Sequence, residues 1–228
     1  MKCHVDGHVV EAHGGTGEPL SRKGETMFIQ VIEGRVADEG RLRAQLARWA
    51  TDLRPAAYGY LGSTGGITSD GICILAVRFA TEADARRNSD RFEQGAWWAE
   101  TKACFEGEVR FHEATDIHLM RHGNADSAAF VQVLEGRVAD RDLARHLDEV
   151  ADDALATARP DLLETITAYH PDGEFTEVAY FRSEQDARDG ETAEVPPELA
   201  DDLALFESTM PTERQLDLRE PWLASPQS

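Results

Sequence analysis

Residues 28–38 of the chain read FIQVIEGRVAD, and residues 130–140 read FVQVLEGRVAD. Nine of the eleven positions are identical, and the two stretches lie 102 residues apart. The same offset relates TEADAR at 81–86 to SEQDAR at 183–188. A match that keeps its register over about ninety residues indicates a tandem duplication, so the chain is predicted to fold as two similar units.

Each copy is predicted to contain its elements in the order β-α-β-β-α-β. The β-branched stretch at 26–36 is typical of a strand, and Asp38 is typical of the residue that caps the following helix. Gly71 and Gly173 follow aspartates between two further strands in each copy, as hairpin turns require. This order is that of the ferredoxin-like unit, so the predicted fold class is α+β with two tandem units.

One such unit leaves apolar positions of its sheet exposed, and packing two sheets together buries them. We therefore expect the chain to form an internal pseudo-dimer, and association into a larger homo-oligomer stays open. The expected organisation is an N-terminal tail at 1–24, repeat one at 25–118, a linker at 119–126, repeat two at 127–220 and a C-terminal tail at 221–228.

Composition excludes several classes of protein. The 228 residues include 43 acidic and 23 basic side chains, which gives a formal charge of −20 and argues against nucleic-acid and anionic-lipid partners. No apolar run approaches the length of a membrane span, and the first residues lack the apolar segment of a secretion signal. Three widely spaced cysteines favour reduced thiols, so a cytoplasmic location is expected.

The two copies differ most at the second helix, and this difference suggests a ligand site in repeat one alone. Trp97 and Trp98 have no aromatic counterparts in repeat two. Either they pack in the core, or one of them lines a pocket for a flat apolar ligand. If the helix continues, Asn88 and Arg91 share one face and are able to polarise a phenolate; the alternative is a surface ion-pair network.

Gln30 and His112 complete the candidate set. Gln30 sits in a mostly apolar strand and is repeated as Gln132, which favours a structural hydrogen bond, although it is also able to face the pocket. His112 on the last strand of repeat one is a candidate general base, against the alternative of an ordinary structural histidine.

Other histidines and cysteines give weak signals. His118 and His122 follow in the linker, and Cys3, His4, His8 and His13 lie near the N-terminus without a matching second cluster. This spacing is only weak evidence for a zinc site, so the sequence predicts no metal and no cofactor, and metal binding by the N-terminal cysteine and histidines stays open.

The order of elements in both copies, together with RFATEADARRNSDRFEQGAWW at 78–98, resembles the dimeric α+β barrel superfamily that includes antibiotic-biosynthesis-monooxygenase-like proteins. The resemblance is to tandem actinobacterial members and covers nearly the whole chain beyond residue 25. It implies small-molecule binding, and an expected activity of a cofactor-independent monooxygenase acting on an apolar aromatic or polyketide-like substrate. The alternative is a non-catalytic ligand-binding or stress-associated protein of the same fold.

Overall fold

The computed structural model describes residues 27–194 and 200–225. The proposed flexible tail at 1–24, with its cysteine and histidines, lies outside the described residues. Asp38 caps the first helix by accepting a hydrogen bond from the main-chain N–H of Arg41 at 2.9 Å, as its position predicts. The elements of repeat one are β1 (Phe28–Val36), α1 (Glu39–Arg48), a π-helical turn (Trp49–Leu53), a 3-10 turn (Arg54–Ala56), β2 (Tyr60–Ile67), β3 (Ile72–Phe79), α2 (Glu82–Ser89), α3 (Phe92–Lys102) and β4 (Phe105–Ala114).

Repeat two follows the same order. Asp140 and Ser183 cap its first two helices, and Gly173 takes a positive φ of 85° in the hairpin, as does Gly71 in repeat one. The connecting strand is β5 (Asp116–Arg121). Repeat two then contains a 3-10 turn (Ala125–Ser127), β6 (Phe130–Arg137), α4 (Arg141–Ala158), β7 (Leu162–Tyr169), β8 (Glu174–Phe181), α5 (Glu184–Thr192), α6 (Ala200–Thr209), β9 (Thr212–Leu218) and the short β10 (Trp222–Ala224).

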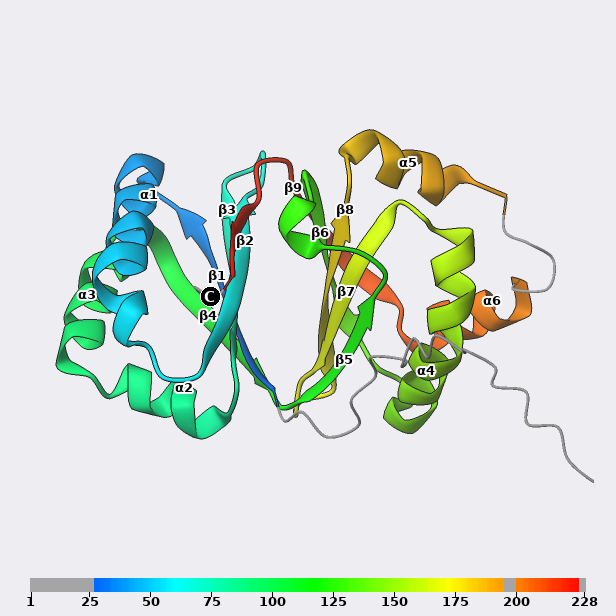
Figure 1. The fold of residues 1–228 in the computed structure, drawn as a ribbon, viewed down its shortest axis with the longest axis horizontal. Coiled ribbons are helices and arrows are strands. Elements are labelled where there is room, and N and C mark those ends of the chain that lie inside the picture. Colours follow the sequence, from blue (N-terminus) through cyan, green and yellow to red (C-terminus); the bar gives the residue numbers. More distant parts are fainter. Residues whose placement is uncertain (1–26, 195–199, 226–228) are drawn as a thin grey trace, which may run out of the picture.

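Two antiparallel five-stranded sheets form the centre of the molecule, and the helices cover their outer faces (Figure 1). The strand orders are β10-β2-β3-β1-β4 and β5-β7-β8-β6-β9. The four strands that each repeat supplies to its own sheet, β2-β3-β1-β4 and β7-β8-β6-β9, have the ferredoxin-like order, which confirms the predicted fold class. The inner faces of the two sheets share one apolar core that draws on both repeats, so the expected internal pairing of sheets is present.

Each sheet is completed by a strand that follows the other repeat. Strand β5 comes directly after repeat one but pairs with β7, and β10 comes after repeat two but pairs with β2. The intervals expected as a linker (119–126) and a C-terminal tail (221–228) therefore contain residues of these edge strands. This exchange covers two sheet edges that would otherwise present unpaired main-chain groups.

The second helix of repeat one does not continue as the sequence analysis assumed. It ends at Ser89, and a new helix, α3, begins after Arg91, which occupies the N-cap position with extended backbone. Asn88 and Arg91 therefore do not share one helical face, which corrects that premise. Among the described residues, no helix is long and apolar enough to cross a membrane.

Candidate functional site

The tryptophans of α3 pack between the helices and the first sheet. Trp97 is buried and donates its indole N–H to the main-chain oxygen of Gln45 at 2.8 Å. Trp98 is partly buried and meets Phe111 edge-on, with ring centroids 5.2 Å apart. Trp97 thus joins α3 to α1, whereas Trp98 covers an aromatic side chain of β4. Contact between either tryptophan and a substrate stays a prediction.

Asn88 and Arg91 have main-chain partners. Asn88 is 6% exposed, and its amide accepts a hydrogen bond from the Tyr58 N–H and donates one to the Tyr58 carbonyl, at 3.0 and 2.8 Å. Arg91 donates to the carbonyls of Leu53 and Ala56, at 3.3 and 3.1 Å. These bonds fix the loop before β2 and the end of the first helical segment, so both side chains hold structure together here.

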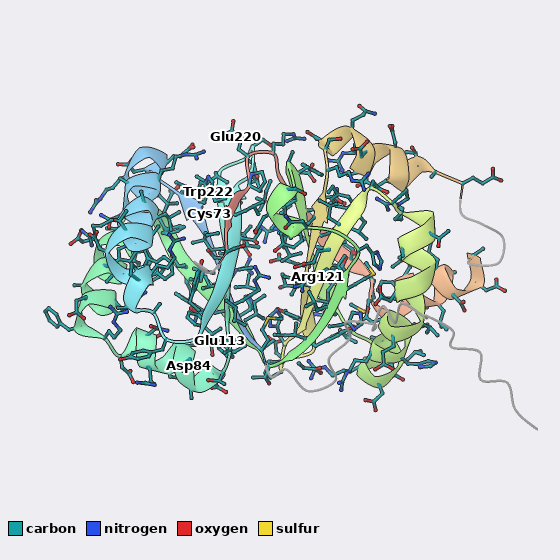
Figure 2. The ribbon with its side chains drawn as sticks, viewed as in Figure 1. Cys73, Asp84, Glu113, Arg121, Glu220 and Trp222 are labelled. Carbon is teal, nitrogen blue, oxygen red and sulfur yellow. The ribbon has the colours of Figure 1, made fainter. Side chains whose placement is uncertain are left out.

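Gln30 faces the helices of repeat one. Its amide donates to Glu113 at 2.8 Å, and Arg86 of α2 binds the same carboxylate at 2.5 Å. These two partners outweigh burial and lower the pKa of Glu113. Figure 2 shows Glu113 at the end of the first sheet nearest α2. Gln132 lies opposite Asp217, the counterpart of Glu113, with its amide nitrogen 3.5 Å from that carboxylate, and it donates to Glu191 of α5 at 2.7 Å, so both glutamines hydrogen-bond to carboxylates as the structural interpretation expects.

His112 lies at the seam between the repeats, on the inner face of the first sheet. It lines two adjoining cavities of about 200 and 450 Å³. Its ring centroid is 5.3 Å from that of His170 on the opposite repeat. Of the predicted site residues, His112 is therefore the one that reaches a described cavity.

A group of buried polar side chains lies elsewhere, between the second sheet and α4. Register places His118, Thr167 and Glu177 in one row across strands β5, β7 and β8, on the face that the helices cover. Asp148 of α4 and Tyr169 of β7 lie beside this row. Tyr169 is 1% exposed and Asp148 is 7% exposed, and the Tyr169 hydroxyl donates a short hydrogen bond to the Asp148 carboxylate.

Thr167 and Tyr169 each make one further contact, and His118 has a ring nitrogen that is unpaired within the described part of the chain. Thr167 donates to the Glu177 carboxylate at 3.2 Å, and the Tyr169 oxygen lies 3.4 Å from the Met210 sulfur. The Nε2 atom of His118 is enclosed and has no hydrogen-bond partner among the described residues. We call His118, Asp148, Tyr169 and Glu177 the repeat-two cluster.

Burial changes the acidity of these groups. It raises the pKa of the Asp148 carboxyl, while the hydrogen bond from Tyr169 and the nearby His118 oppose that rise. Burial, and then the charge of Asp148, raise the pKa of the Tyr169 hydroxyl. Burial, reinforced by the same Asp148 charge, raises the pKa of Glu177 to about 7. Glu177 is thus able to exchange a proton near neutral pH.

Repeat one provides an internal comparison, because its corresponding positions are apolar. The row that contains His118, Thr167 and Glu177 corresponds to a row in the first sheet that packs beneath α1. The counterparts of His118, Thr167, Glu177, Asp148 and Tyr169 are Trp222, Gly65, Leu75, Leu46 and Ile67. Figure 2 shows Trp222 and Cys73, which pack in this apolar layer with Leu75.

The sequence carried a signal for part of the cluster. At the offset of 102, Leu46, Ile67 and Leu75 become Asp148, Tyr169 and Glu177. A comparison that looks for polar residues present in repeat one alone misses these positions, because they are apolar in repeat one and polar in repeat two. His118 is different: its counterpart follows from the exchange of edge strands, which no sequence offset reveals.

The cluster offers proton-transfer groups rather than a set of metal ligands. A carboxyl that titrates near pH 7 is suited to general acid–base work, and an enclosed imidazole nitrogen is free to bind a polar substituent. Asp148 is already paired with Tyr169, which fixes its orientation. The arrangement is suited to removing a proton from a phenol or an activated methylene group.

Searches against family models and against curated proteins give no match for this sequence. Solved structures are similar in fold. A candidate monooxygenase from Fusobacterium nucleatum subsp. nucleatum covers 88% of this chain and 94% of its own, with 8% identity and a TM-score of 0.69. A candidate monooxygenase from Lactobacillus acidophilus covers 89% and 97%, with 12% identity and a TM-score of 0.66. An anthrone oxidase-like protein covers 88% and 90%, with 6% identity and a TM-score of 0.60.

The chain has the fold of these monooxygenase-like proteins. Each similarity spans both repeats, so the predicted fold, with its two tandem units, is confirmed. Because the identities are only 6–12%, the similarity concerns the backbone fold and not the side chains. What the chain does must therefore be argued from its own side chains.

Proposed function

We propose that the chain binds a small aromatic molecule on the helix-covered face of the second sheet and oxidises it with dioxygen, without a bound cofactor. The repeat-two cluster carries this proposal. Its four polar groups replace apolar residues at the corresponding positions of repeat one. Burying polar groups costs stability unless they are fully hydrogen-bonded, and the apolar copy shows that the fold does not require them.

The proposed chemistry starts with proton removal. Glu177, with a pKa of about 7, takes a proton from a methylene group activated by flanking aromatic rings, as in an anthrone. The resulting carbanion supplies electrons to dioxygen. One oxygen atom ends in the new carbonyl group and the other leaves as water, so the methylene compound and dioxygen give the quinone and one water molecule.

The other cluster members would hold the substrate. The enclosed Nε2 of His118 is the group proposed to bind a substrate hydroxyl or carbonyl; it lies two strands from Glu177 in the same row, with Thr167 between them. The Asp148–Tyr169 pair keeps a negative charge near Glu177, which favours the protonated product of the transfer. The site in this proposal lies in repeat two, whereas the sequence predicted repeat one.

Oxygen uptake tests the proposal. The full chain is mixed with an anthrone-type compound at pH 7.5, and dioxygen consumption and quinone absorbance are followed together. We expect Glu177→Gln to lower the turnover rate by about 100-fold, the lower range for loss of a general base. Asp152→Asn is the control, because Asp152 lies on α4, the helix that carries Asp148, but binds His122 at 2.6 Å outside the cluster.

Two results would overturn the enzyme proposal. A chain that quenches the fluorescence of the bound compound but consumes no dioxygen is a ligand-binding protein, which is the alternative that the sequence left open. Equal turnover by the full chain and Glu177→Gln would remove Glu177 from the reaction.

The proposed cytoplasmic location is compatible with the buried free thiols Cys73 and Cys104.

A further inference from the structure

Three possible metal ligands converge at the seam between the repeats. His112 lies on β4 of the first sheet, and Asp172 and Glu174 lie in and directly after the β7–β8 hairpin of repeat two. One ligand atom from each lies within 4.8 Å of the other two. The His112 Nδ1 and a Glu174 oxygen are 3.7 Å apart, a separation that a metal ion bound to both at about 2.1 Å accommodates.

The hairpin holds its two carboxylates in place before any ion binds. The main-chain N–H of Glu174 donates to the Asp172 carboxylate at 3.1 Å and turns it toward the seam. The main-chain N–H of His170 donates to the Glu174 carbonyl at 2.9 Å. Arg137 contacts Glu174 Oε1 at 2.9 Å, which leaves Oε2 to face His112. Ligands fixed in this way need little further ordering to bind an ion.

Arg137 pairs with the proposed ligand Glu174, whereas the two other nearby arginines pair with carboxylates outside the ligand set. Arg110 binds the buried Glu33 at 2.7 Å, and Arg214 binds Glu33 and Glu135 at 2.6 and 3.0 Å. These partners reduce the repulsion that a cation at His112 would otherwise meet. The two cavities that His112 lines leave space for water molecules to complete the coordination of the ion.

The duplicated fold again supplies a comparison. His112 pairs with Val31 across the first sheet, and its counterpart, which pairs with Val133, is Leu216. The counterpart of Glu174 is Ile72. Leu216 and Ile72 are both buried in the core between the sheets. The fold therefore packs well with apolar residues at these positions. Histidine and glutamate occupy them only where β4 of repeat one meets the β7–β8 hairpin of repeat two.

We propose that His112, Asp172 and Glu174 bind a divalent transition-metal ion. One imidazole nitrogen and two carboxylate oxygens suit zinc or manganese, and the two carboxylates balance the charge of the ion. The ion would tie the last strand of repeat one to the hairpin of repeat two. This site lies between the sheets, whereas the repeat-two cluster lies on the opposite face of the second sheet, so neither proposal depends on the other.

Calorimetric titration with zinc chloride at pH 7 tests the site, with manganese and magnesium chloride as further probes. The protein is the full chain with Cys3→Ser, His4→Ala, His8→Ala and His13→Ala, because those residues offer other zinc ligands. On this background, His112→Ala and Glu174→Gln should each weaken zinc binding by about 100-fold or more. His146→Ala and Asp70→Asn are the controls: His146 is exposed on α4, and Asp70 is the hairpin counterpart of Asp172.

The expected result is one zinc ion per chain, with unchanged affinity in both controls and a raised melting temperature on zinc addition. Far-UV circular dichroism verifies that each variant is folded. The proposal is overturned if the tail-substituted chain binds none of the three ions. It is also overturned if both His112→Ala and Glu174→Gln bind zinc as tightly as the controls do.

Discussion

Replacing Glu177 by glutamine should change how stability depends on pH. In the folded chain the pKa of Glu177 is raised from 4.5 to about 7, chiefly by burial. The folded state therefore holds this proton more tightly than the unfolded state does. The stabilisation is complete below pH 4.5, and it is lost as the pH rises from 4.5 through 7. At 1.36 kcal/mol per pKa unit, the loss amounts to about 3 kcal/mol by pH 8.

Glutamine resembles the protonated acid and does not titrate, so Glu177→Gln should match the original chain near pH 4.5 and exceed its free energy of unfolding by about 3 kcal/mol at pH 8. Urea unfolding followed by far-UV circular dichroism measures this difference. Glu108→Gln, at an exposed position of β4, is the control. A difference between Glu177→Gln and the original chain that is the same at both pH values would refute the reasoning.

Two further predictions concern stability and assembly. Tyr169→Phe should lower the free energy of unfolding by about 1–3 kcal/mol at pH 8, because the buried Asp148 carboxylate loses its hydrogen bond. This loss should be smaller in a chain that also carries Asp148→Asn. Urea unfolding of the two single variants and the double variant measures the coupling between the two residues. Ending the chain at Arg219 should remove β10, uncover the edge of β2 and produce dimers or larger aggregates on size-exclusion chromatography, and a truncated chain that stays monomeric and folded would contradict the role given to β10.

Local signals in the sequence predicted much of the fold. Asp38 and Ser183 cap helices as their residue types suggest, and Gly71 and Gly173 have the positive φ that their hairpins need. Strand β10 was missed because it has three residues, too few to show an alternating pattern, and β5 was missed because it follows the end of β4 after a single residue. The break at Arg91 was missed because no proline or glycine marks it.

The candidate site was harder to predict, because a side chain's role depends on which partners the fold gives it. Asn88 looks like a substrate-binding amide in the sequence, yet its amide is bonded to the main chain of Tyr58 and of Asp84. Glu177 looks like one acidic residue among 43, yet its place beneath α4 gives it a pKa of about 7. These two cases are distinguished only by comparing equivalent positions of the two repeats, and that comparison requires the sheet register.

The exchange of edge strands explains how repeat two is able to hold destabilising polar groups. Because β5 and β10 each close the sheet of the other repeat, and both sheets share one inner core, neither repeat is expected to unfold alone. The cost of burying Asp148 and Glu177 is therefore borne by the whole molecule, and the apolar layer of repeat one, with Leu75 and Trp222, helps to offset it. Duplication thus gives a physical reason for a division of roles, in which one half stabilises the fold while the other retains titratable groups.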